Sequence, residues 1–306
     1  MHPLRGIAMK LISVLVFIVM AAVIKGTDGR VPVGEVVFFR SLFAIPVILS
    51  WLMWRGELAQ GLKAQDPLGH VWRGFAGTTA MGLGFAGLTF LPLPEVTVLG
   101  YAAPLLTVIF AAMFLGEEVR AFRIGCVVLG MVGVMIVLAP RLTLGADATG
   151  SVAAFGAMLV LCGAVFSALA QVFVRKLVMS ETTSSIVFRF SVTSTVLSLT
   201  TLPFGWVWPS PADAAMLVGA GLMGGVGQIF LTSSYRDADA SLVAPFEYAS
   251  MLFSLVIGYL VFAEVPSRTM MIGATLIVTA GVLIIWRERR LGIERNRQRK
   301  AMTPQG

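Results

Sequence analysis

The amino-acid sequence predicts an all-α integral membrane protein of ten transmembrane helices, arranged as two inverted five-helix repeats. Three observations carry this prediction: long apolar runs along the whole chain, an uneven distribution of Lys and Arg between alternate loops, and an internal repeat. The composition agrees, because 57% of the 306 residues are hydrophobic, only 13% are charged, and the mean hydropathy is +0.88. A soluble globular domain has about a quarter of its residues charged, so the composition excludes that class.

Each apolar run is long enough to cross the hydrocarbon core as a helix, which needs about 20 residues. Only helices and closed barrels satisfy backbone polar groups in lipid, and the runs lack the strict alternation of barrel strands. The first run follows Arg5 and Lys10, as in a signal peptide, but no clear small-residue cleavage site follows it, so we expect it to be a span. The predicted spans are 7–24, 33–54, 74–91, 93–115, 121–139, 152–174, 184–202, 214–235, 240–262 and 269–286.

The positions of Lys and Arg predict the orientation. With the N-terminus in the cytoplasm, 17 of the 23 fall on the inner side, four on the outer side and two, Arg40 and Arg189, within spans. Cytoplasmic loops carry such an excess of Lys and Arg. We therefore expect a bacterial inner-membrane protein with both termini cytoplasmic. Seven of the 17 lie in residues 287–306, which predicts a basic cytoplasmic tail facing anionic lipid headgroups.

The internal repeat divides the chain into residues 7–140 and 151–286. Residues 101–117 align without gaps on residues 248–264, with a tyrosine at the start and a glutamate at the end of both segments. Each half has five predicted helices, an odd number, so the second half crosses the membrane in the opposite sense. Rocking of two such halves is a recurring transporter design. A duplication that only enlarges a scaffold is the alternative.

Several motifs accompany the repeat: Phe38-Phe39-Arg40, Tyr101-Ala-Ala-Pro104, Gly116-Glu117 and Ile124-Gly125 followed by Gly133. With these motifs the chain resembles the drug/metabolite transporter superfamily, in the type with two EamA domains. The resemblance implies a ten-helix basket whose central cavity opens alternately to each side, and transport of amino acids, nucleotide-like compounds, vitamins or drugs. The second copy departs from the pattern, because Met251 answers Pro104 and Ala263 answers Gly116.

The first run and residues 244–248 are similar to those of riboflavin importers in this superfamily. The resemblance thus implies uptake of riboflavin or a similar planar aromatic metabolite, with export of amino acids or related metabolites as the alternative. A membrane-embedded enzyme or a scaffold is the alternative of a different class. The sequence has no nucleophile–base pattern, Walker loop or dinucleotide fingerprint, so we expect no enzyme and no cofactor. Its two Cys and two His have no ligand spacing, which predicts no metal.

Candidate substrate-binding residues are aromatic and amide side chains in the predicted helices four, six, eight and nine. Tyr101, Tyr248 and Phe246 offer aromatic faces on which a planar ring stacks, and the tyrosines add hydroxyl groups. Gln171 and Gln228 offer amide hydrogen bonds. Packing for the aromatic residues and cross-linking of helices for the glutamines are the alternatives.

Charged residues within the spans form a second set of candidates. Glu247 belongs to one copy only, because its repeat mate is Gly100. A buried carboxylate can exchange a coupling proton or bind substrate, and an ion pair with Arg189 is the alternative. Arg40 and Arg189 each cost about 2.5–3.5 kcal/mol at a helix centre on insertion scales. We interpret them as anion-attracting gates or as structural arginines.

Two prolines and two glutamates complete the candidate set as structural or gating residues. Pro104 and Pro245 free backbone carbonyls within their spans, which is tolerated where the helix faces protein or a wet cavity. Glu117 and Glu264 end their helices at opposite membrane faces, and we expect them to terminate helices rather than to bind substrate.

Overall fold

The computed structural model describes residues 3–115, 121–143, 148–177, 179–237 and 243–302. Over these ranges every regular element is a helix. The elements are α1 (Pro3–Lys25), α2 (Val33–Trp54), α3 (Leu58–Leu62), α4 (Pro67–Phe90), α5 (Leu93–Gly100), α6 (Ala102–Leu115), α7 (Ala121–Thr143), α8 (Ala148–Leu177), α9 (Thr183–Leu199), η1 (Leu202–Phe204), α10 (Pro211–Asp237), η2 (Ala244–Tyr248), α12 (Ala249–Phe262) and α13 (Arg268–Met302).

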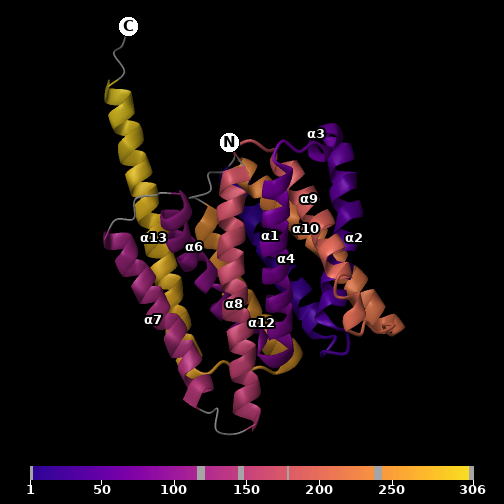
Figure 1. Ribbon diagram of the computed structural model, residues 1–306. Helices are drawn as coiled ribbons and strands as arrows, with labels where there is room; N and C mark the ends of the chain where they lie inside the picture. The colour runs from indigo at the N-terminus through magenta and orange to yellow at the C-terminus, as the bar shows by residue number, and fades with distance from the viewer. Residues whose placement is uncertain (1–2, 116–120, 144–147, 178, 238–242, 303–306) are drawn as a thin grey trace.

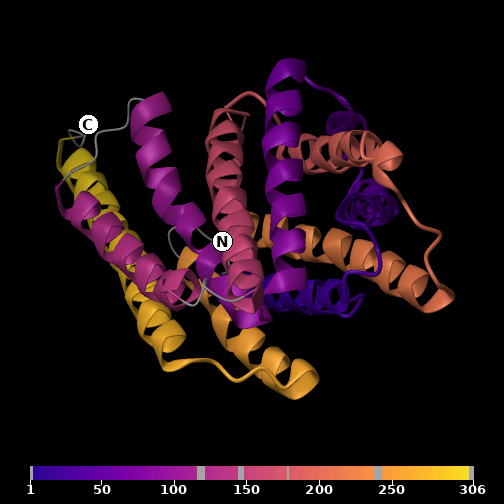
Figure 2. The same ribbon diagram turned by 60° about the horizontal axis from the view of Figure 1, so that its bottom comes forward.

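The long helices form one bundle in which helices distant in sequence lie side by side. Figure 1 shows the start of α1 and the end of α13 at the same end of the bundle. The main interfaces pair α1 with α10, α4 with α8, and α7 with α13. Figure 2 shows α7 and α13 together at the outer edge, away from α2 and α9. The other helices therefore surround the centre of the bundle.

Eight helices in the described part of the chain are long and apolar enough to cross a membrane, and α9 is a shorter apolar helix. The predicted third span, 74–91, lies in α4, which is 24 residues long but falls outside this set. Its sequence is rich in glycine and threonine and includes His70 and Arg73, so its hydropathy is lower than that of its neighbours. The finding supports a membrane protein with at least these eight spans, and ten spans stay a prediction.

Helices four and nine of the prediction are both interrupted at equivalent tyrosines. The first is divided into α5 and α6 at Tyr101, and the second changes from the 3-10 helix η2 to α12 after Tyr248. In the first copy Pro104 has no amide hydrogen for the carbonyl of Gly100, four residues earlier, which breaks the α-helical ladder there. In the second copy Pro245 lies in the first turn of η2. Different prolines thus accompany a break at the same repeat position.

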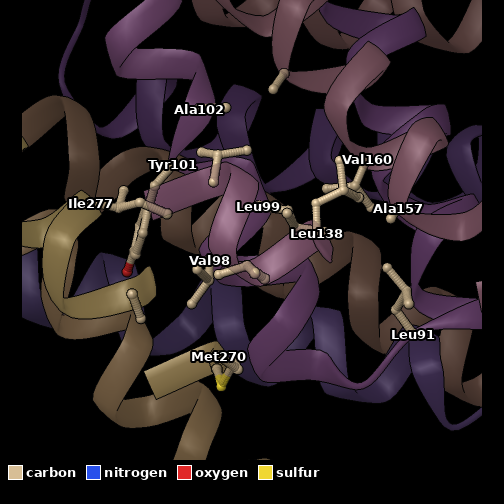
Figure 3. Close-up of a cluster of buried hydrophobic side chains, with 14 of the residues drawn as sticks. Leu91, Val98, Leu99, Tyr101, Ala102, Leu138, Ala157, Val160, Met270 and Ile277 are labelled. Carbon is tan, nitrogen blue, oxygen red and sulfur yellow. The ribbon is translucent and has the colours of Figure 1, made fainter. Parts of the chain in front are cut away.

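The largest buried apolar cluster lies around the break at Tyr101. It joins α5 and α6 to α7, α8, α12 and α13. Figure 3 shows Tyr101 beside Val98 and Ile277, with Val160 and Ala157 of α8 on the other side of Leu99. At full burial such side chains contribute about 1.5–3 kcal/mol each. The cluster therefore fixes the interrupted helix against both halves of the chain.

Candidate functional site

A cavity of about 520 Å³ lies between six helices, α2, α4, α5, α8, α9 and α10. This volume falls within the range of about 300–1,000 Å³ that is typical of small-molecule sites. Both predicted halves of the chain contribute to its wall. The lining residues are Arg40, Arg73, Gly77, Ala80, Met81, Gly84, Val96, Gly100, Val160, Gly163, Ala164, Ser167, Ala170, Gln171, Val174, Ile186, Val187, Phe190, Gln228, Leu231 and Thr232.

The cavity extends toward the end of the bundle where both termini lie. Its lining residues come from the later parts of α8 (160–174) and α10 (228–232) and from the first part of α9 (186–190). These parts lie toward the end at which α1 begins (Figure 1). Gln171 lines the cavity and is nevertheless exposed, so the cavity reaches the molecular surface beside α8.

The opposite end of the bundle is closed by a network of polar contacts. The Nζ atom of Lys25, at the end of α1, lies 3.1 Å from Oε1 of Glu264, which follows α12. The same ammonium donates hydrogen bonds to the carbonyls of Leu88 (3.2 Å) and Leu91 (2.7 Å), and Oε2 of Glu264 accepts one from the Leu93 amide (2.9 Å). The network connects α1, α4, α5 and α12. Glu264 therefore lies just after the end of α12, near its predicted position, and also connects this helix to others.

Two arginines face the cavity, and prediction from the sequence identified only one of them. Arg40 of α2 is 6% exposed and packs against Gly224 of α10. Arg73 of α4 stacks on Phe190 of α9, with its guanidinium carbon 3.7 Å from the ring centroid. Arg73 precedes the predicted span 74–91 and was assigned to a loop. Asp66 caps α4 and Pro67 begins it, and this N-terminal signature is the signal that extends the helix to include Arg73.

Hydrogen-bonding side chains complete the polar part of the wall. The predicted residues Gln171 and Gln228 both line the cavity, together with Ser167 and Thr232. Gly84 and Gly100 lie where an added Cβ atom would have no atom within 4 Å, so both glycines leave open space beside the cavity. The arrangement suits a polar organic molecule that packs against apolar walls and forms hydrogen bonds at a few points.

The predicted aromatic residues lie outside the set that lines this cavity. The rings of Tyr101 and Tyr248 pack edge to face with centroids 5.0 Å apart. The Tyr101 hydroxyl lies 2.5 Å from Oγ of Ser250, and Tyr101 is buried. Phe246 is half-buried in η2. The tyrosines therefore join the two interrupted helices to each other, and their predicted contact with a substrate stays a prediction.

Glu247 forms an ion pair with Lys10, not with Arg189. The Lys10 side chain is only 2% exposed, whereas that of Glu247 is 49% exposed. Arg189 instead donates a hydrogen bond of 2.7 Å to the carbonyl of Leu62. Membrane depth suggested the pair with Arg189, but depth does not fix the direction in which a side chain leaves its helix. Lys10 was assigned to the cytoplasmic side and in the structure belongs to α1.

The remaining candidates have structural positions. Pro104 is exposed on α6, and Pro245 is in η2, neither of them lining the cavity. Glu117 lies outside the described residues. No group of His, Cys, Asp and Glu in the described ranges is arranged to hold a metal ion.

Comparison with known proteins agrees with this architecture. The model of the EamA-like transporter family matches residues 4–139 and 154–286. A solved crystal structure of a protein is similar with a TM-score of 0.63 and 21% identity, covering 94% of this chain and 98% of that one, which shows the fold.

Relatives of full length carry different transport names. An S-adenosylmethionine uptake transporter of Rickettsia felis is 28% identical over 287 residues, covering 94% of both chains. A pseudopaline exporter of Pseudomonas aeruginosa is 28% identical over 280 residues, 91% of this chain and 95% of that one. A riboflavin transporter of Vibrio cholerae is 28% identical over 300 residues, covering 96% and 98%. The chain therefore belongs to the EamA-like transporter family, and it is a membrane transporter rather than an enzyme.

Proposed function

We propose that the chain is a secondary transporter that moves a small organic metabolite across the bacterial inner membrane by alternating access. The observation that carries this proposal is the cavity of about 520 Å³, with polar side chains on apolar walls, between the two halves of the chain. We assign it as the substrate site. Ten spans in two inverted repeats are part of the proposal, because alternating access by rocking needs two equivalent halves.

The helix contacts support two equivalent halves. If α1, α2, α4, α6 and α7 correspond to α8, α9, α10, α12 and α13, the contact of α1 with α10 becomes the contact of α8 with α4. In the same way the contact of α2 with α10 corresponds to that of α9 with α4, and the contact of α6 with α8 corresponds to that of α12 with α1. All six of these pairs are in contact, and so are α2 with α9 and α7 with α13, which correspond to themselves.

The described conformation corresponds to an inward-open state in this proposal. The cavity extends toward the end with the termini, which the excess of Lys and Arg assigns to the cytoplasm. The Lys25–Glu264 network closes the other end. In the outward-open state this network would be broken and the cytoplasmic end closed.

The relatives suggest which substrates to test. Uptake of riboflavin is the prediction from the sequence, and the similar uptake transporter for S-adenosylmethionine suggests a second solute that contains a planar heteroaromatic ring. Export is the competing direction, suggested by the pseudopaline exporter. Glu247 is the candidate for a coupling proton.

The test is uptake of labelled riboflavin or S-adenosylmethionine by bacteria that express the chain, with unlabelled solute as competitor. Gly84→Leu should abolish uptake, because its side chain fills open space beside the cavity. Gly219→Leu is the matched control, because Gly219 has equally open surroundings on α10 but does not line the cavity. Saturable uptake lost only in Gly84→Leu supports the proposal. Equal uptake by both variants would show that the cavity is not part of the transport path. If neither solute is taken up although the chain is expressed in the membrane, the assignment as an uptake transporter is wrong.

A further inference from the structure

The cavity contains two positive charges that no described acidic group offsets. Arg40 and Arg73 are the only charged residues among those that line it within the described ranges. None of the ion pairs among the described residues includes either of them. A buried charge without a partner costs several kcal/mol, so its presence needs a cause.

The donor atoms of both side chains are left without acceptors. Nε of Arg40, and Nε and Nη1 of Arg73, are buried and have no hydrogen-bond partner in the described part of the chain. Buried polar groups are satisfied in the great majority of cases. The protein therefore leaves both guanidinium groups incompletely paired, and because both residues line the cavity, a molecule within it can offset their charges.

Both guanidinium groups are held in place by the fold. Arg73 lies over the ring of Phe190, and both are close enough to Gly77 that a side chain there would collide with them. Arg40 packs against Gly224, where an added Cβ would lie 3.0 Å from Nε. Both arginines line the same cavity, so one anion bound there would offset both positive charges.

We infer that Arg40 and Arg73 form an anion subsite, so that the transported metabolite carries a carboxylate or a phosphate. This inference rests on the proposed function and narrows its substrate class. The rest of the molecule lies along Gln171, Gln228 and the apolar wall, where amide hydrogen bonds and packing are available. S-adenosylmethionine, with its carboxylate, satisfies this chemistry, whereas riboflavin satisfies it only as its 5′-phosphate.

Binding to the purified full chain tests the subsite with two matched pairs of probes. One pair is S-adenosylmethionine and its decarboxylated form, and the other is riboflavin 5′-phosphate and riboflavin. We expect the member that carries the carboxylate or the phosphate to bind in at least one pair, and the member that lacks this group to bind about tenfold to a hundredfold more weakly. Whether the carboxylate or the phosphate pair shows this difference distinguishes the two anions.

Variants separate recognition from folding. Arg40→Gln and Arg73→Gln should each weaken binding of the probe that carries the carboxylate or phosphate by a similar factor. Binding of the probe that lacks this group should be unchanged. Arg55→Gln is the control, because Arg55 follows the same helix as Arg40 and also lies over an aromatic ring, that of Trp51, but does not line the cavity. Without ligand, both cavity variants should melt at or above the wild-type temperature, since each removes a buried charge.

The outcomes are distinct. Three results would overturn the subsite and assign the arginines a structural role. The first is equal binding of both members of each pair, and the second is no binding of either probe that carries the carboxylate or phosphate. The third is a melting temperature that Arg40→Gln and Arg73→Gln lower while binding is unchanged. Selective binding without transport of the bound probe in proteoliposomes would instead retain the subsite and overturn the proposed function.

Discussion

The ammonium group of Lys25 lies 3.1 Å from the carboxylate of Glu264, and the two side chains are only 15% and 13% exposed. Lys25 ends α1 in the first half of the chain, and Glu264 follows α12 in the second half. This largely buried ion pair thus connects the halves at the closed end of the bundle. In an alternating-access cycle this contact has to break once in each turnover.

Substitution of this pair should destabilise the protein. Lys25→Met or Glu264→Gln leaves a largely buried charge and several backbone groups without partners, so we expect the free energy of unfolding to fall by about 3 kcal/mol. In the double variant the free energy of unfolding should fall by less than the sum of the two single reductions. Denaturant unfolding in micelles measures these changes. The Arg30–Asp213 pair at the same end is the control. Asp213 is only 7% exposed but Arg30 is 53% exposed, so loss of that pair should have a smaller effect than loss of a pair in which both partners are largely buried. Equal effects of the two pairs would refute a special role for Lys25–Glu264.

A second prediction concerns Lys10 and Glu247. Glu247→Gln removes the carboxylate that faces a nearly fully buried ammonium group. We expect a loss of about 1–3 kcal/mol, below that of a fully buried pair because half of Glu247 is in contact with solvent. Combining Lys10→Met with Glu247→Gln should restore most of the lost free energy of unfolding, because no buried charge is then left without a partner. Uptake by Glu247→Gln should also lose its dependence on pH if Glu247 carries the coupling proton. Unchanged pH dependence would exclude Glu247 from that role.

The loop before α9 predicts a dependence of stability on pH. Glu181 accepts hydrogen bonds from the amides of Gln65 (2.5 Å) and Asp66 (2.8 Å), and it lies 3.2 Å from Nε2 of His70. Burial alone would raise the pKa of this carboxyl, but the amide hydrogen bonds and His70 outweigh it and lower the pKa below its ordinary value of 4.5. The lowered pKa stabilises the fold above about pH 4.5, and this contribution disappears as the pH falls through the lowered pKa.

Melting temperatures measured between neutral and acidic pH test this contribution. Glu181→Gln should have a lower melting temperature than the wild type at neutral pH, and the difference should narrow as the pH falls through the lowered pKa of Glu181. A difference that stays constant across this range would show that the charge of Glu181 contributes nothing.

The residue after α12 offers a stabilising substitution. Ala263 has a left-handed backbone conformation with φ of 54°. This conformation costs a residue with a Cβ atom about 1–2 kcal/mol, whereas glycine adopts it freely. We expect Ala263→Gly to raise the free energy of unfolding by about 1 kcal/mol. Asp28 has a similar φ of 50°, but aspartate tolerates it better, so Asp28→Gly should give a smaller gain. A larger gain at Asp28 would contradict this explanation.

Much of the architecture follows from patterns along the chain. Apolar runs identify the membrane helices, the repeat identifies Tyr101 and Tyr248 as equivalent, and both helices are interrupted there. Three of the lining residues were candidates. Arg40 was one because a charge within an apolar run is costly, and Gln171 and Gln228 were candidates because their amides offer hydrogen bonds. These inferences use only position along a helix.

The missed features depend on direction around a helix axis and on where each helix begins. Hydropathy placed Arg73 before the span 74–91, and Lys10 was counted among the cytoplasmic cations at the start of the span 7–24. In the structure α4 begins earlier and includes Arg73, and the Lys10 side chain is buried. The association of Glu247 with Lys10 rather than Arg189 depends on the rotation of three helices, which their sequences leave undetermined.

The crossing of α7 and α13 has a consequence for how this chain tolerates mutation. A Cβ atom on Gly133 would lie 2.7 Å from the carbonyl oxygen of Gly273, and one on Gly273 would lie 2.5 Å from that of Gly133. Side chains of the opposite helix also lie close, Ile277 to Gly133 and Val137 to Gly273, but the main chain of that helix restricts each glycine by itself. A smaller side chain on the opposite helix cannot compensate for a larger residue here, since the obstacle is an atom that every amino acid has. The two positions should thus resist substitution independently, and no second-site exchange between them should rescue either one.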